Sequence, residues 1–120
     1  MAEYVYTQND NELILELHEG GSAKDLSAAT KVEIQLFSLK SDPANKVAAA
    51  ASWDSVADAA LFDLSGIATG RLVFKPDATA LASLTAPNYY GRLVIFSTDY
   101  PNGIVWTKTI SDLFLLVIGA

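Results

Sequence analysis

Three aspartates that follow one another closely, Asp54, Asp58 and Asp63, are the residues of this chain that could hold a divalent cation. Carboxylate oxygens are the ligands that Ca²⁺ takes in proteins. A calcium loop, however, spaces its ligands at alternate positions around a central glycine, and this segment has neither feature. Because aspartate is mostly a surface residue, we interpret the three as solvated carboxylates and expect no metal site.

The sequence also lacks the motifs of zinc sites, nucleophilic catalysis and phosphate binding. His18 is the only histidine and cysteine is absent, which removes disulfides, thiolate sites and the ordinary zinc sites. Ser65-Gly66 lacks the upstream glycine of a nucleophile elbow, because Asp63 occupies that place. Gly20-Gly21 is followed by neither a helix signal nor the lysine of a phosphate loop. We therefore expect a protein that is not an enzyme, with no catalytic residue and no cofactor.

The acidic charge balance of the chain argues against a nucleic-acid partner. The 120 residues contain 8 Lys+Arg and 14 Asp+Glu, a net charge of −6. The basic residues are scattered singly, whereas nucleic-acid binding depends on clustered cations that neutralise phosphates. The segment 1–6 lacks the charge and apolar core of a secretory signal, and no apolar run reaches the roughly 18 residues of a spanning helix. We expect one soluble domain over residues 1–120, made in the cytoplasm, with no membrane partner.

Strict alternation of apolar and polar residues predicts β-strands. In an extended chain, successive side chains point to opposite faces, so alternation marks a strand that buries one side. Two segments show this pattern, with Leu13, Leu15 and Leu17 in the first and Val32, Ile34 and Leu36 in the second.

Turn residues divide the rest of the chain into further short segments with strand propensity. We expect these strands at 4–7, 47–53, 60–64, 70–75, 91–97, 104–110 and 113–118. The alanine-rich segment 47–53 is also compatible with a helix, and 78–84, with Asp77 as its N-cap, is expected to form one helical turn. About seven to nine short strands without βαβ alternation predict an all-β, two-sheet antiparallel sandwich.

The order of these strand motifs resembles that of small immunoglobulin-like domains in the virions of tailed bacteriophages. The motifs are Val32-x-Ile34-x-Leu36, then Gly70-Arg71-Leu72-Val73-Phe74, then Tyr90-Gly91-Arg92-Leu93-Val94-Ile95-Phe96 before a turn at Gly103. The similarity covers residues 10–118. The group of domains includes the N-terminal domain of phage upper-baseplate proteins, which holds receptor-binding proteins in place. It implies an immunoglobulin-like sandwich with a structural role in a virion, and it supplies no catalytic residue.

Aromatic and apolar residues in the late strands are the strongest hint of an interface. Exposed Tyr and Trp are enriched in protein interfaces, although half-buried strand positions also favour them. The segments 93–96 and 113–118 are apolar at successive positions, so their outer face must be covered by the chain's own loops or by a neighbour. The interface candidates are Val94, Phe96, Tyr89, Tyr90, Tyr100 and Trp106.

Together these features predict a structural component of a bacteriophage virion, in the capsid, neck, tail or baseplate. Its expected partners are other virion proteins and further copies of itself, as a homo-oligomer in the particle. The alternative is a glycan-binding adhesion module, in which the aromatic side chains would line an open stacking platform. The two hypotheses differ in whether those side chains are buried by a partner protein or exposed to a sugar.

Overall fold

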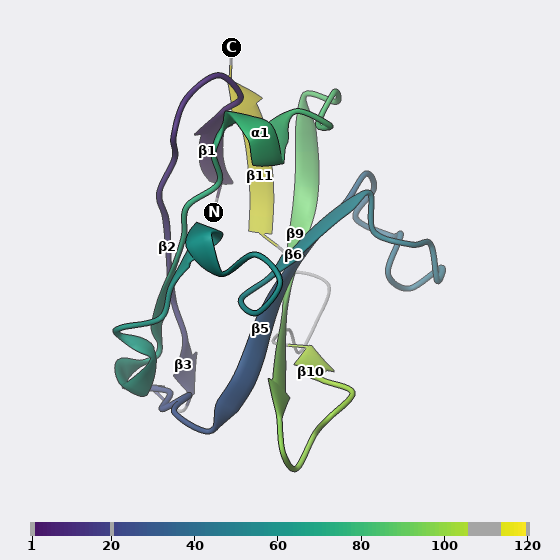
Figure 1. The fold of residues 1–120 in the computed structure, drawn as a ribbon. Helices are drawn as coiled ribbons and strands as arrows, with labels where there is room; N and C mark the ends of the chain where they lie inside the picture. Colours follow the sequence, from purple (N-terminus) through teal and green to yellow (C-terminus); the bar gives the residue numbers. More distant parts are fainter. Residues whose placement is uncertain (1, 20, 106–113, 120) are drawn as a thin grey trace.

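A computed structural model describes residues 2–19, 21–105 and 114–119 of the chain. Strands dominate it, and the expected all-β class is confirmed (Figure 1). The strands are β1 (Ala2–Tyr6), β2 (Leu13–Glu16), β3 (His18–Glu19), β4 (Ser22–Ala23), β5 (Ala29–Phe37), β6 (Ala51–Asp54), β7 (Phe62–Asp63), β8 (Arg71–Phe74), β9 (Asn88–Ser97), β10 (Ile104–Val105) and β11 (Phe114–Gly119). Two 3-10 turns (Ala59–Leu61 and Ile67–Thr69) and one short helix, α1 (Ala78–Leu81), interrupt them. No helix in this described part is long and apolar enough to cross a bilayer.

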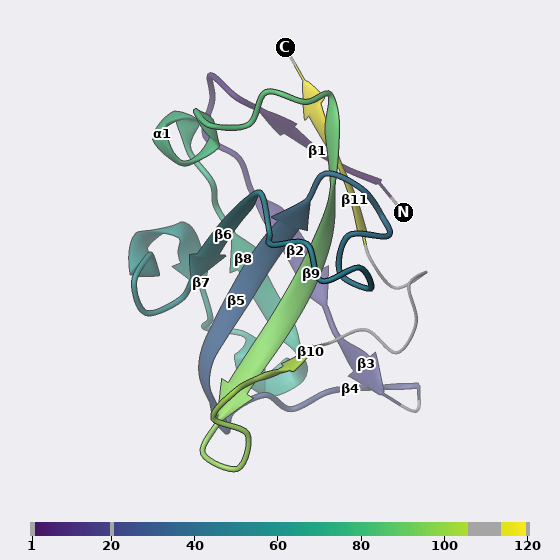
Figure 2. The ribbon, with the colours of Figure 1, turned by 90° about the vertical axis from the view of Figure 1, so that its right-hand side faces the viewer.

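The strands form two main sheets, which Figure 2 shows from the side of the larger one. The large sheet has the order β1-β11-β9-β5-β6, with β10 paired to β9. Its long central strands β5 and β9 are antiparallel, whereas β1 joins the sheet parallel to β11. The small sheet has the order β2-β8-β7, and β3 and β4 form a separate pair.

One hydrophobic core joins the two sheets. The three alternating apolar residues of β5, Val32, Ile34 and Leu36, are fully buried there, as their spacing predicts. Phe74 of the small sheet lies 5.3 Å from the ring of Trp53 and 5.2 Å from that of Phe62, measured between ring centroids. Burial of each such side chain stabilises the fold by about 1.5–3 kcal/mol. Because successive side chains of a strand point to opposite faces, burial of these three residues places the residues between them on the opposite face of the large sheet.

The segment after β5 departs from the predicted strand at 47–53. Strand β6 begins only at Ala51, and residues 38–50 form a loop that projects from the sheets (Figure 1). The carboxylate of Asp42 accepts the N–H of Leu39 at 2.9 Å, and the Asp42 carbonyl accepts the N–H of Val47 at 3.0 Å. These turn bonds satisfy backbone groups that a strand would otherwise have used.

Other boundaries differ by less. The predicted strand at 60–64 is shortened to Phe62–Asp63, because its first residues form a 3-10 turn. The Asp77 N-cap is confirmed, since its Oδ1 accepts the N–H of Ala80 at 2.8 Å, although the helix ends at Leu81. The hairpin after β9 is confirmed by the pairing of Ile104 with Ile95. The rest of the predicted strand 104–110, from residue 106 on, lies outside the described residues.

Candidate interaction surface

The face of the large sheet that points away from the core, called the outer face below, gathers most of the accessible aromatic side chains among the described residues. Strand alternation places it opposite the buried residues Val5 of β1 and Leu116 of β11. The positions on this face include Tyr4, Tyr6, Lys31, Glu33, Gln35, Phe37, Asn88, Tyr90, Arg92, Val94, Phe96, Leu115 and Val117.

The tyrosines of β1 are the most exposed aromatic residues of this face. Tyr4 is 59% exposed and Tyr6 is 48% exposed. Tyr6 is paired with Gly119 of β11, and its ring lies so close over this glycine that a Cβ atom there would come within 2.5 Å of it. Gly119 thus lets the Tyr6 ring lie flat across the neighbouring strand, as an aromatic residue often does beside a strand glycine.

Tyr90 continues this aromatic surface into the centre of the sheet. It is half-buried, and its cross-strand partners are Leu115 on one side and Phe37 on the other. Cross-strand neighbours on one face have Cβ atoms about 4.5–5.5 Å apart, so Tyr90 and Leu115 form a continuous surface, whereas Phe37 is only 2% exposed. We call the set Tyr4, Tyr6, Tyr90, Leu115 and Val117 the aromatic strip.

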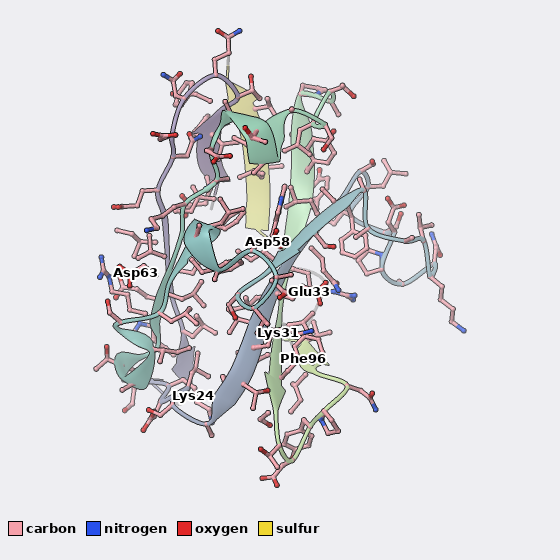
Figure 3. The ribbon with its side chains drawn as sticks, viewed as in Figure 1. Lys24, Lys31, Glu33, Asp58, Asp63 and Phe96 are labelled. Carbon is pink, nitrogen blue, oxygen red and sulfur yellow. The ribbon has the colours of Figure 1, made fainter. Side chains whose placement is uncertain are left out.

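The other half of the outer face is polar, and its cations are engaged within the sheet. The Arg92 guanidinium donates to the Gln35 carboxamide oxygen at 2.9 and 2.7 Å and lies 5.0 Å from the centre of the Phe37 ring. Lys31 Nζ lies 4.2 Å from the centre of the Phe96 ring, on the side of the sheet where Figure 3 also shows Glu33. Each cation–π contact at such a site contributes about 0.5–1 kcal/mol.

Two of the six interface candidates from the sequence are buried by the chain itself. Val94 is only 5% exposed, because the chain returning from the β9–β10 hairpin passes over it at Gly103. The Tyr89 ring lies in the core, and its hydroxyl accepts the N–H groups of Thr85 at 3.0 Å and of Ala86 at 3.1 Å. This corrects the expectation that these two side chains are available to a partner.

The remaining candidates are distributed over the molecule. Tyr90 and Phe96 are half-buried on the outer face, and Tyr100 is 55% exposed at the tip of the β9–β10 hairpin. Trp106 lies outside the described residues. Sequence reasoning missed Tyr4 and Tyr6, although their alternation around an apolar valine is itself a strand signal.

The three aspartates considered as cation ligands serve local turns. Asp54 Oδ1 accepts the N–H groups of Ala57 at 2.7 Å and Val56 at 2.9 Å, and Asp63 Oδ1 accepts that of Ser65 at 2.9 Å. The hydrogen bond from Ala57, with smaller contributions from Val56 and the charge of Lys31, lowers the pKa of Asp54. Asp58 and Asp63 lie well apart in Figure 3. Among the described residues, no group of three His, Cys, Asp or Glu side chains is placed to hold a metal ion.

A shallow hollow lies at one end of the small sheet. Its lining consists of Asp10, Asn11, Glu12, Ala60, Leu61, Lys75 and Asp77. Asp77 is occupied as the helix cap, and Asn11 bonds to the backbone of Tyr6 and Pro76. The lining contains carboxylates and Lys75 but no hydroxyl, thiol or imidazole side chain, so we take the aromatic strip as the candidate functional surface. Comparison of the chain with protein-family models, with curated proteins and with solved structures found no match.

Proposed function

We propose that the chain is an immunoglobulin-like sandwich of the variable type. The order β11-β9-β5-β6 in the large sheet and β2-β8-β7 in the small sheet corresponds to the G-F-C-C′ and B-E-D orders of such domains. The Tyr89 hydroxyl, at the start of β9, bonds back to the backbone just upstream, as in the tyrosine corner of these domains. Gly91 stands two residues later, where antibody domains carry a disulfide cysteine.

The function we propose for this domain is that of a non-enzymatic structural component of a bacteriophage virion, which assembles through its outer face. The observation that carries it is the aromatic strip, in which Tyr4 and Tyr6 are about half exposed beside half-buried Tyr90. Rigid aromatic side chains bury a large area on binding at a small entropy cost, and exposed apolar surface of this kind marks partner sites. The resemblance of the strand motifs to virion domains supplies the context of the particle.

Assembly by a face rather than by an edge is supported by the ends of the large sheet. At one edge, the Asn11 side chain accepts the Tyr6 N–H at 2.8 Å and donates to the Tyr6 carbonyl at 3.1 Å. At the other edge, Asp58 accepts the Asp54 N–H at 3.0 Å and its own N–H bonds to the Asp54 carbonyl. Groups that are already bonded in this way cannot pair with a second sheet, which favours association through the face over pairing at these two edge positions.

A glycan-binding module is the second candidate, and one observation favours it. Tyr4 and Tyr6 project from the same side of one strand with no described segment covering them, an arrangement that could also stack on sugar rings. The same substitutions test both functions, because each function predicts that the variant loses binding to a different ligand: a protein partner in the first and a glycan in the second.

The test compares the purified chain with the double variant Tyr4→Ala/Tyr6→Ala. We expect self-association, or binding to disassembled virion proteins, to fall at least about tenfold, because two interface aromatics each contribute 1 kcal/mol or more. Light scattering and pull-down measure it, with Val56→Ala as a control, since Val56 is 67% exposed in the turn after β6 and is not an interface candidate. A wild-type chain that stays monomeric at high concentration and binds no virion component contradicts the proposal, and loss of glycan binding instead favours the second candidate.

A further inference from the structure

The edge of the small sheet at β2 has an open backbone. The N–H of Asn11 bonds to the Pro76 carbonyl at 3.0 Å and the N–H of Leu17 to the Gly70 carbonyl at 2.8 Å, so the odd-numbered residues face the neighbouring strand. In an antiparallel pair, alternate residues bond to alternate sides. The backbone groups of Glu12, Ile14 and Glu16 therefore point away from the sheet, along its free edge.

These outward groups have no hydrogen-bond partner within the described structure, and that distinguishes β2 from the other edge strands. Tyr6 of β1 and Asp54 of β6 are capped by side chains, and the N–H of Phe62 in β7 bonds to the carbonyl of Ala59. Beside these caps, outward residues such as Tyr4 of β1 and Ser52 of β6 also stay open, but on β2 three successive outward residues carry no cap in the described structure. A continuous run of free N–H and C=O groups is a template for one more strand.

The side chains of this edge indicate the chemistry of the strand that fits. Glu12 and Glu16 are exposed and flank Ile14, which is 41% exposed. Opposite charges across a strand pair stabilise it, while like charges directly opposite destabilise it. A strand with two basic residues around an aliphatic one therefore complements β2, and Glu16 would then lie between that cation and Arg71 of β8.

A second copy of this chain is a poor occupant of the same edge. Antiparallel pairing of two β2 strands centred on Ile14 would set Glu12 of each copy opposite Glu16 of the other. Each copy also carries a net charge of −6. Both effects oppose self-pairing at this edge.

We propose that β2 is an acceptor edge that binds an extended basic segment of another protein by strand addition. Main-chain hydrogen bonds from Glu12, Ile14 and Glu16 hold the segment, and the two glutamates select lysine or arginine at two positions four residues apart, on either side of an aliphatic residue. This inference is independent of the virion role and of the aromatic strip, which belongs to the other sheet.

The first experiment uses a defined peptide as the probe, acetyl-Ser-Thr-Lys-Thr-Val-Thr-Lys-Thr-Ser-amide, added to the isotopically labelled chain. We expect the amide resonances of Glu12, Ile14 and Glu16 to shift and the hydrogen exchange of the Ile14 amide to slow by about tenfold or more. A peptide of the same composition with its lysines adjacent should have a clearly smaller effect. Equal effects of the two peptides, or shifts confined to other surfaces, overturn the proposal.

Two variants test the backbone and the charges separately. Ile14→Pro removes an outward N–H without touching the β2–β8 bonds, and it should weaken peptide binding about tenfold or more, whereas Ser52→Pro on the β6 edge should not. Glu12→Lys/Glu16→Lys should reverse the preference, so that a peptide with glutamates in place of lysines binds better. This reversal keeps the proposal falsifiable if Ile14→Pro does not fold, and an unchanged preference overturns it. Tyr4→Ala/Tyr6→Ala should leave peptide binding unaltered, which separates the acceptor edge from the outer face.

Discussion

Arg92 and Gln35 face each other across the two central strands of the large sheet, joined by two hydrogen bonds of 2.9 and 2.7 Å to one carboxamide oxygen. The same guanidinium lies over the Phe37 ring, so three side chains hold one another in place. This group stands between the aromatic strip and the charged half of the outer face. It therefore fixes the boundary of the surface that we propose for assembly.

Replacement of Arg92 by lysine tests that group. Lysine keeps the charge but loses the planar fork and its stacking on Phe37, so we expect a loss of about 0.5–1.5 kcal/mol in the free energy of unfolding. Urea unfolding followed by circular dichroism measures it. A variant as stable as the wild type would show that the contact does not contribute.

Tyr89→Phe removes a single hydroxyl from the core. The N–H groups of Thr85 and Ala86 then lose their acceptor while the ring stays in place. We expect destabilisation by about 1–3 kcal/mol, since unpaired and partly buried donors are costly. Thermal unfolding measures the effect, and Tyr90→Phe on the opposite face is the matched control, for which little change is expected.

Gly103→Ala tests why Val94 is buried. Gly103 has φ of +84°, and a Cβ there would lie 2.5 Å from Val94 Cγ1 and 2.9 Å from the Phe96 ring. Gly21→Ala is a close control, because its φ is +83° but no atom lies within 4 Å of the added carbon. We expect backbone strain of about 1–2 kcal/mol in both variants and a further 1–3 kcal/mol of overpacking at Gly103 alone. Equal losses would contradict the close approach of the hairpin to Val94.

The lowered pKa of Asp54 predicts how stability responds to acid. The Ala57 N–H favours the ionised carboxylate in the folded state, so the pKa of the folded Asp54 carboxyl lies below its ordinary value. A depressed pKa contributes stability above the unfolded value, and this contribution is lost as the pH falls through the folded pKa. Asp54→Asn should therefore show a flatter decline in stability below about pH 4, measured by urea unfolding across the acid range. An unchanged slope would contradict this role of the carboxylate.

The alternation of apolar and polar residues predicted which side chains lie in the core better than it predicted which lie on the surface. Val32, Ile34 and Leu36 could be placed because a period of two assigns one buried face, and Asp77 because helix caps follow local rules. A turn after the Val32 strand could be expected from Asp42 and Pro43, but its extension to residue 50 could not, because the Asp42 carbonyl takes the Val47 N–H and the alanines favour strand pairing only weakly.

The interface candidates show the same limit. The strand around Val94 and Phe96 is apolar on both sides, and sequence alone does not say whether a partner or the chain's own hairpin covers it. Tyr89 and Tyr90 are adjacent, so they lie on opposite faces, and nothing local tells which of them is in the core. Tyr4 and Tyr6 were missed because their exposure depends on β1 pairing with β11, which is a long-range contact.

The parallel pairing of β1 with β11 also determines when this fold can be completed during synthesis. Ala2 lies beside Leu115, so β1 is translated long before the strand with which it pairs. Until then, the tyrosines of β1 remain in a nascent chain that cannot finish its large sheet. Pairings between such distant segments form slowly, which exposes unfinished β proteins to aggregation and makes them clients of chaperones. We therefore expect the yield of folded chain to depend on translation speed and chaperone supply more than on changes in the outer face.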